Sequence, residues 1–162
     1  KLLKPAVLTI ACAEDLSPIA EQKHIHLWSV TETPTVVVAN EDALRLLMTN
    51  LCDNALRYTP EGGEIRIETL IKDTEASIRV CDNGPGIPEI ERERIFERFY
   101  RAEGTKTIPG TGLGLAIVRR VAELHGGKPS ISEGIGGKGV CFSIDFPICK
   151  AAVEDQPPEA DE

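Results

Sequence analysis

The strongest pattern in the chain lies between residues 41 and 59, where apolar residues recur at three- and four-residue spacing. This spacing predicts an amphipathic helix with Asn40 as its N-cap. A similar apolar stripe over residues 113–125 stops at two consecutive glycines, which is a typical helix end. A third helix is predicted over residues 5–23, bent or interrupted near Pro18.

Alternating apolar and polar residues predict strands between these helices. Residues 62–71 and 75–82 form a predicted hairpin, and residues 140–146 form a predicted closing strand. Two apolar runs, 24–30 and 35–39, predict further strands. Hairpins without strict strand–helix alternation indicate an α+β fold, a two-layer sandwich with the helices packed on one face of a mixed sheet of five or more strands.

Two segments lack the patterns of regular structure. The stretch 89–110 begins with a charged helical turn and then loses periodicity among Gly, Thr and Pro, which predicts a mobile loop. The stretch 151–162 carries five acidic residues and no Lys or Arg, which predicts a disordered tail. With 41% hydrophobic residues in the chain, residues 1–150 are long enough to form one globular domain with a proper core.

Charge and cysteine content narrow the class of protein. The formal net charge of −8 argues against a surface that coats nucleic acid. The chain has no apolar run of membrane-spanning length, no signal peptide and no initial Met, so we expect a piece of a longer protein. Five cysteines without metal-ligand spacing predict free thiols in a reducing cytoplasm rather than a disulfide framework. His24 and His26 are expected on an ordinary exposed strand face, because a metal site needs more than two ligands.

One acidic residue stands where the strand 75–82 meets the glycine- and proline-rich stretch "DNGPGIP". Strand alternation places Asp82 on the same side as Ile78 and Val80, which is the side expected to face the core. A buried carboxylate without a donor costs several kcal/mol, so we expect a hydrogen-bond partner for it.

Two further stretches carry candidate chemistry. In "NLCDNALRYT", Asn50 and Asn54 lie one helical turn apart and would line a cleft beside the core, although surface or capping roles could also explain them. In "GTGLGLAIV", residues 110–118, glycines directly before a helix let backbone amides approach an anion at the positive helix end. A dinucleotide-binding fold is disfavoured, because the segment upstream is a polar loop instead of an apolar strand.

The order and spacing of "NLCDNALRYT", "DNGPGIP", "FERFYR" and "GTGLGLAIVRRVAELHGG" resemble the nucleotide-binding boxes of sensor histidine kinases. The catalytic domain of this family shares the Bergerat ATP-binding fold with gyrase, heat-shock chaperone and mismatch-repair ATPases. The likeness covers residues 40–127 and extends more weakly to both ends. It implies that residues 1–150 are a histidine kinase catalytic ATP-binding domain with ATP and Mg²⁺ as its cofactors.

The resemblance also implies roles for individual residues. Asp82 matches the acceptor of the adenine amino group, which a pocket can use to select adenine over guanine. Asn54 matches the magnesium ligand, Arg57 a phosphate contact and Tyr58 a flat wall near the base or ribose. Asn50 and Asn54 are the candidate catalytic residues. Phe96 and Phe99 match the aromatic box that anchors a lid over residues 97–110. The remaining candidate nucleotide-binding residues are Gly84, Gly86, Ile87, Arg101, Lys106, Gly110, Thr111, Gly112, Leu113, Gly114 and Leu115, although Lys106 could equally be a solvated loop charge.

Three functions remain open on the sequence. A sensor histidine kinase domain would pass the γ-phosphoryl group of ATP to a histidine, a clamp ATPase would hydrolyse ATP, and a degenerate module would bind without chemistry. The hydrolases resemble one another in having Glu at the position of Asn50, where it activates water, and an amide cannot accept a proton. The sequence therefore favours the kinase.

The phosphoacceptor is expected outside this chain, because His24, His26 and His125 lack the acidic residue that follows the acceptor histidine in the family. His125 is instead expected to have a structural role. The implied partners are the protein's own dimerisation and histidine-phosphotransfer domain and a response regulator, with no nucleic acid. We expect the full-length protein to be a homodimer and the isolated domain to be a monomer. We also expect this chain to lie in the cytoplasmic part of an inner-membrane bacterial sensor.

Two positions depart from the family pattern. Gly139 is followed by Val140 instead of the usual Thr, so a hydroxyl contact is expected to be missing there. Pro129 stands where a strand residue of the family normally donates a hydrogen bond, which suggests an edge strand or a bulge.

Overall fold

The computed structural model describes residues 2–3, 5–31, 37–72, 74–100 and 114–148. The predicted tail 151–162 and most of the predicted lid 97–110 lie outside these ranges. In the described residues, none of the helices combines the length and the apolar character needed to cross a bilayer.

Five strands form one mixed sheet in the order β2-β4-β5-β7-β6. β2 (His26–Thr31) pairs in parallel with β4 (Glu64–Lys72), and all other neighbours are antiparallel. The remaining strands are β5 (Glu75–Asp82), β6 (Lys128–Glu133) and β7 (Val140–Pro147). A separate two-stranded sheet joins β1 (Leu2–Leu3) to β3 (Val37–Val38).

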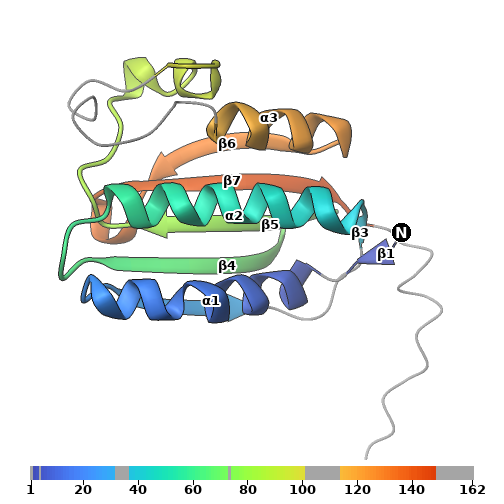
Figure 1. The fold of residues 1–162 in the computed structure, drawn as a ribbon. Helices are drawn as coiled ribbons and strands as arrows, with labels where there is room; N and C mark the ends of the chain where they lie inside the picture. The colour runs from blue at the N-terminus through green and yellow to red at the C-terminus, as the bar shows by residue number, and fades with distance from the viewer. Residues whose placement is uncertain (1, 4, 32–36, 73, 101–113, 149–162) are drawn as a thin grey trace, which may run out of the picture.

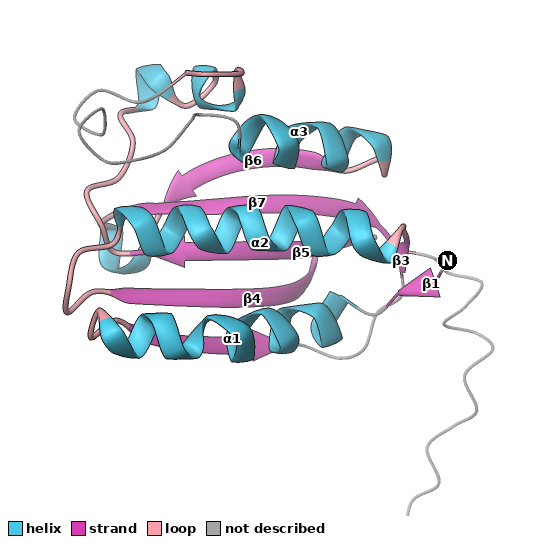
Figure 2. Ribbon diagram, in the orientation of Figure 1, coloured by secondary structure: helices cyan, strands magenta, loops and turns pink. Residues whose placement is uncertain are grey.

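Three helices cover one face of the main sheet: α1 (Pro5–Gln22), α2 (Glu41–Tyr58) and α3 (Gly114–Leu124). Figure 1 shows them in front of the strands, and Figure 2 shows the same two layers coloured by type of element. Buried side chains from all three helices and from β4, β5 and β7 form one hydrophobic core between the layers. The predicted α+β sandwich is confirmed.

The local predictions for the helices hold, except that of the two alternatives at Pro18, a bend or an interruption, the interruption is wrong. Asn40 caps α2, since its side-chain oxygen accepts a hydrogen bond from the Ala43 amide at 2.9 Å. α1 continues through Pro18 without interruption. Pro18 is exposed, so water can solvate the carbonyl that loses its helical donor there. Pro129 lies in β6, which is an edge strand, as expected.

The expectation of free thiols is wrong for one pair of cysteines. Cys81 of β5 and Cys141 of β7 are register partners and form a disulfide. They are 60 residues apart in sequence, and only the pairing of β5 with β7 brings them together. Cys12 and Cys52 are free.

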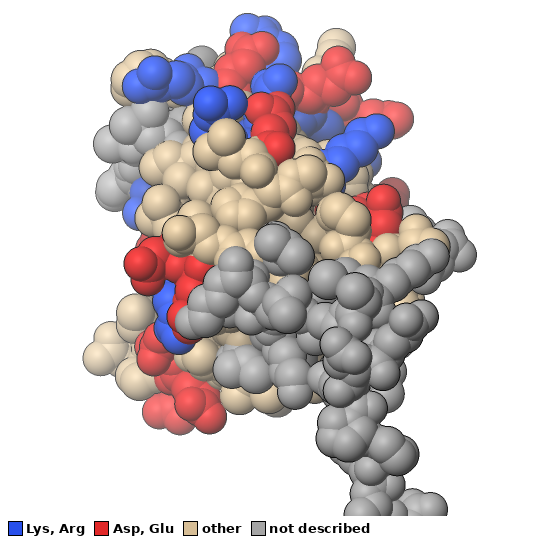
Figure 3. Space-filling view, turned by 90° about the vertical axis from the view of Figure 1, so that its right-hand side faces the viewer, with Lys and Arg blue, Asp and Glu red and all other residues tan. Residues whose placement is uncertain are grey.

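Three short 3₁₀ segments complete the described fold: η1 (Glu89–Glu91), η2 (Arg94–Phe96) and η3 (Ile135–Gly137). η2 packs against α3, and η3 connects β6 to β7. In the view of Figure 3, Lys and Arg side chains are interspersed with Asp and Glu along the upper part of the molecule.

Candidate nucleotide-binding site

Asp82 lies at the end of β5 with 3% of its surface exposed. Its Oδ1 accepts hydrogen bonds from the backbone amides of Gly84 at 2.9 Å and Val140 at 3.3 Å. In the described part of the chain no donor contacts its Oδ2. Burial raises the pKa of the Asp82 carboxyl, and the two amide hydrogen bonds oppose that rise. The site therefore holds a buried carboxylate with one oxygen bound to the backbone and the other available to a ligand.

Glycine backbone packs directly against this carboxylate. A Cβ atom on Gly139 would lie 2.4 Å from Asp82 Oδ1, and Gly139 has a φ of +70°. A Cβ on Gly84 would lie 3.3 Å from the same oxygen and 3.0 Å from the Tyr58 carbonyl oxygen. A Cβ on Gly86, which has a φ of +76°, would lie 3.0 Å from the Gly139 carbonyl oxygen. The absence of side chains at Gly84 and Gly139 lets their backbone approach Asp82, and Gly86 in turn packs against Gly139.

Sequence reasoning missed the contribution of Gly139 and Val140. Val140 entered it as the start of the closing strand and as the residue that replaces a Thr, whereas its backbone amide is one of the two donors to Asp82. A signal was present in the four glycines between residues 134 and 139. That density is typical of a turn that must approach another backbone closely.

α2 and α3 meet beside the two candidate asparagines. Asn50 donates a hydrogen bond to the Leu46 carbonyl at 2.8 Å, and its Oδ1 would lie 3.1 Å from a Cβ on Gly114. The first residue of α3 therefore sits against Asn50. Asn54 is half-exposed one turn further along α2, and no described residue hydrogen-bonds its side-chain amide.

The end of α2 carries the other predicted contacts. The Arg57 guanidinium forms an ion pair with Asp53 at 2.9 Å on the exposed side of the helix, so a phosphate contact would compete with this carboxylate. Tyr58 is half-buried.

Lys23 of α1 donates from its ammonium group to the carbonyls of Leu56 and Thr59, the latter at 3.2 Å. A cation on the last carbonyls of a helix fixes the position of that end.

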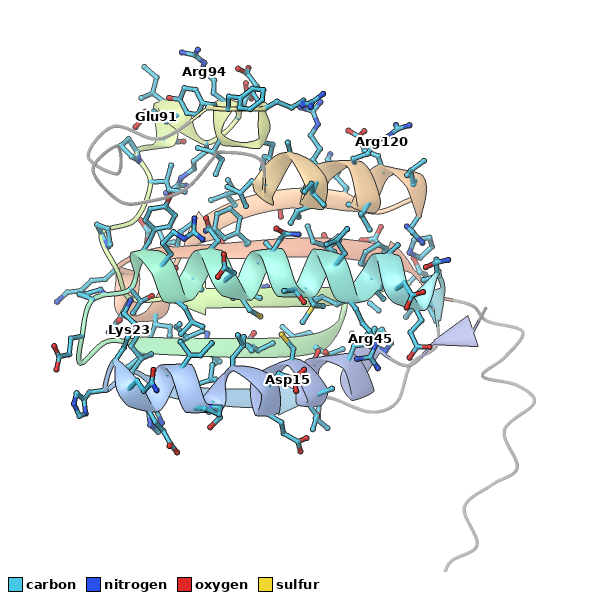
Figure 4. The ribbon with its side chains drawn as sticks, in the orientation of Figure 1. Asp15, Lys23, Arg45, Glu91, Arg94 and Arg120 are labelled. Carbon is cyan, nitrogen blue, oxygen red and sulfur yellow. A yellow bond between two sulfur atoms is a disulfide. The ribbon has the colours of Figure 1, made fainter. Side chains whose placement is uncertain are left out.

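The predicted aromatic box divides into a buried and an exposed residue. Phe96 is 9% exposed and packs edge-to-face on Phe142, with ring centroids 6.2 Å apart. Phe99 is 66% exposed, and the Arg98 guanidinium lies 5.8 Å from its ring centroid. Next to it, the Tyr100 hydroxyl donates to Glu91 at 2.6 Å, which raises the Tyr100 pKa. Figure 4 shows Glu91 and Arg94 in this 3₁₀ region, away from α1 and α2.

The remaining predicted residues are distributed as follows. Ile87 is half-buried against the core, and its carbonyl accepts a hydrogen bond from Arg92 at 3.2 Å. Leu115 also packs against the core from the first turn of α3. The structure does not describe Arg101, Lys106, Gly110, Thr111, Gly112 and Leu113.

His125 has the expected structural role. One ring nitrogen, Nε2, accepts a hydrogen bond from the Asn40 amide at 3.1 Å, and the other, Nδ1, lies 2.7 Å from the Val121 carbonyl. The ring thus joins the end of α3 to the start of α2.

Comparison with known proteins agrees with this geometry. Residues 39–150 match the family described as "Histidine kinase-, DNA gyrase B-, and HSP90-like ATPase". The sensor protein kinase PmrB of Pseudomonas aeruginosa is 39% identical over 146 residues, which are 88% of this chain and 30% of PmrB. The swarming motility regulation sensor protein RssA of Serratia marcescens is 41% identical over 84% of this chain and 29% of its own.

Solved structures show the same fold. The mycobacterial sensor histidine kinase MprB superposes with a TM-score of 0.80 at 29% identity, covering 91% of this chain and 98% of that one. Full-length ShkA, solved in complex with AMPPNP, superposes with a TM-score of 0.79 at 30% identity, covering 92% of this chain and 31% of its own.

The chain therefore belongs to the histidine kinase-, DNA gyrase B- and HSP90-like ATPase family. Within that family it is a histidine kinase catalytic ATP-binding domain. It spans about 30% of the length of PmrB and of RssA.

Proposed function

We propose that this chain binds Mg-ATP and donates the γ-phosphoryl group to a histidine on a separate dimerisation domain, in two-component signal transduction. The observation that supports adenine binding best is Asp82. Its buried Oδ1 is held by two backbone amides, which leaves Oδ2 as an acceptor for the adenine amino group. Guanine carries a carbonyl oxygen at the corresponding ring position, and an acceptor facing an acceptor is unfavourable.

Asn54 is the proposed magnesium ligand. The described residues contain no cluster of three or more His, Cys, Asp or Glu side chains able to hold a metal ion. Magnesium commonly keeps several waters and binds through one or two protein oxygens plus substrate phosphates, so a single amide oxygen fits this arrangement. The half-exposed Asn54 amide has no described hydrogen bond to break before it binds. When bound, Mg²⁺ would neutralise charge on the phosphates.

The other proposed nucleotide contacts surround these two residues. Tyr58 would form a wall near the base or ribose, and Arg57 would turn from Asp53 to a phosphate. Gly114 and Leu115 open α3, and the first backbone amides of a helix form a positive end suited to phosphate. Phe99, Arg101, Lys106 and the glycine-rich residues 110–113 are proposed as parts of a lid over the phosphates.

Asn50 favours phosphoryl transfer over hydrolysis. An amide cannot take a proton from water, and the Asn50 amide group donates to the Leu46 carbonyl. No other acid is assigned to the place of a water-activating carboxylate. ATP bound here should therefore persist until a stronger nucleophile reaches it.

The proposed phosphoacceptor histidine lies outside this chain, and so do the proposed signalling partners. Both ring nitrogens of His125 lie within hydrogen-bond distance of backbone atoms, which argues against a role as acceptor. The chain spans about 30% of its sensor kinase relatives, which leaves room for a dimerisation and histidine-phosphotransfer domain. We propose that the full-length protein is a homodimeric sensor of the bacterial inner membrane and that this chain belongs to its cytoplasmic part, which acts on a response regulator. The isolated domain is proposed to be a monomer.

The test is a radiolabelled ATP assay of the chain alone and with a separate dimerisation domain that carries the acceptor histidine. We expect ATP binding with neither self-labelling nor more than trace hydrolysis by the chain alone, and acid-labile label on the added domain. Brisk hydrolysis by the chain alone would favour a clamp ATPase. Stable label on His24, His26 or His125 would contradict the separation of donor and acceptor.

A further inference from the structure

Two free thiols face each other between α1 and α2. Cys12 Sγ of α1 lies 3.1 Å from Cys52 Sγ of α2. Cys12 is half-exposed, whereas Cys52 is only 1% exposed. A disulfide places its sulfurs about 2 Å apart, so a bond between them requires an approach of about 1 Å.

Cys12 also lines a groove of about 210 Å³ on the outer side of the two helices. Met48 and Leu8 supply apolar wall, and Asp15 of α1 and Arg45 of α2 supply charges. Figure 4 shows Asp15 and Arg45 on these two neighbouring helices. The groove gives small solutes access to Cys12, while Cys52 is reached only through Cys12 or by movement of the helices.

We propose that Cys12 is an oxidation site for hydrogen peroxide and that Cys52 is its resolving thiol. The Cys12 thiolate attacks one peroxide oxygen, so that an S–O bond forms, the O–O bond breaks and hydroxide leaves. This hydroxide takes up the proton that Cys12 released on ionising, which gives the first water. Cys52 sulfur then attacks the resulting sulfenic acid, so that the S–S bond forms and the S–O bond breaks. The proton from Cys52 converts the departing hydroxide to water. Two thiols and one peroxide thus give one disulfide and two waters.

The pKa shift of Cys12 supports the same assignment of roles as its exposure. The hydrogen bond with Cys52 lowers the pKa of Cys12, against the opposing effects of burial and of the Asp15 carboxylate. The thiolate is the nucleophile toward peroxide, so Cys12, which is the more accessible of the two thiols and has a lowered pKa, should react first.

The expected product is a covalent link between α1 and α2 next to the nucleotide site. Cys52 lies on α2 between Asn50 and Asn54. Oxidation would therefore attach α1 to the helix that carries the proposed magnesium ligand.

The experiment treats the reduced, folded 162-residue chain with hydrogen peroxide and maps its tryptic peptides by mass spectrometry. We expect residues 2–23 joined to residues 46–57 as the first new disulfide-linked pair, with circular dichroism unchanged. The peptides that contain Cys81 and Cys141 report general oxidation in the same sample. A Cys52→Ala variant should stop at the sulfenic acid and give about tenfold more dimedone adduct on Cys12 than the unaltered chain. Cys12→Ala is the matched control, and it should leave Cys52 without adduct.

The proposal is overturned if no 2–23 to 46–57 link forms while the fold is intact, or if Cys12 pairs with Cys149 as readily as with Cys52. Equal dimedone labelling of Cys52 in Cys12→Ala and of Cys12 in Cys52→Ala would overturn the assignment of roles. Peptide mapping of the unaltered chain shows whether Cys12 and Cys52 form a disulfide, even if a variant does not fold.

Discussion

The base end and the phosphate end of the proposed site are built differently. At the base end, Asp82 is 3% exposed and is held by the backbone amides of Gly84 and Val140. Toward the phosphates, Asn54 is half-exposed without a described hydrogen bond, and Arg57 is paired with Asp53 on an exposed helix face. The proposed base acceptor is thus fixed by the sheet before any ligand binds, whereas the proposed phosphate-binding side chains would have to be ordered by the ligand. Substitutions at the base end should consequently affect both folding and specificity, and those at the phosphate end should affect binding alone.

The largest effect is expected at Gly139. In Gly139→Ala, the new Cβ would lie 2.4 Å from Asp82 Oδ1 and from the Asp82 carbonyl oxygen, on a residue with a φ of +70°. Strain of this φ and overpacking against backbone should together lower the free energy of unfolding by about 3 kcal/mol or more. Urea denaturation measures this change.

Gly136 provides the matched control for Gly139. It has a φ of +65°, and a Cβ there meets nothing within 4 Å. Gly136→Ala should therefore show only the backbone cost of about 1 to 2 kcal/mol. Equal destabilisation by the two substitutions would mean that close packing around Asp82 contributes nothing.

The next effect concerns the proposed recognition of adenine by Asp82. Asp82→Asn keeps the shape of the side chain and can still accept from Gly84 and Val140, but it replaces the free acceptor with a donor. We expect ATP affinity to fall by about 2 kcal/mol or more, roughly 30-fold, while the fold is retained. Isothermal titration measures the dissociation constant, and an unchanged value would remove Asp82 from the base pocket.

A smaller and more selective loss is expected at Asn54. Asn54→Ala should weaken the magnesium-dependent part of ATP binding by about 1.4 kcal/mol, or tenfold, because it removes one oxygen ligand. Adenosine has no phosphates, so its affinity should stay nearly the same. A variant that loses adenosine and Mg-ATP affinity equally would show a folding defect instead of a lost metal ligand.

The smallest effect is the pH dependence of stability that Asp82 introduces. Burial raises its pKa in the folded chain above the ordinary value of 3.8, so the folded state holds this proton more tightly than the unfolded state. The contribution to stability is fully present below pH 3.8 and is lost as the pH rises through the folded pKa. Asp82→Asn should therefore gain stability relative to the unaltered chain as the pH increases. Parallel urea titrations at acidic and neutral pH test this, and a constant difference would show that burial of the carboxylate has no net cost.

The sequence alone was sufficient to predict the three helices, the β4–β5 hairpin and the position of Asp82 at the end of a strand. Helical spacing in α2 and α3, and strict alternation in β4 and β5, are local patterns that report which face is buried. The core-facing side of Asp82 followed from the same alternation. Predictions that depended only on near neighbours in the chain were accurate for this reason, except for the possible interruption of the first helix at Pro18.

The features that were missed arise from contacts between distant segments. The register of β5 with β7 creates the Cys81–Cys141 disulfide and brings the Val140 amide to Asp82. The packing of α1 on α2 creates the Cys12–Cys52 pair. No spacing along the sequence specifies a strand register or a helix contact, so these partners could not be identified from it. The roles of residues 101–113 stay predictions.

Comparison of ATP and GTP binding to the unaltered chain tests the central claim most directly. Titrations of the two nucleotides in the presence of Mg²⁺ share every phosphate, ribose and metal contact and differ only at the base. If the free oxygen of Asp82 accepts the adenine amino group, ATP should bind at least about tenfold more tightly than GTP. Equal dissociation constants for the two nucleotides would contradict the assignment of Asp82 as the base-specific acceptor.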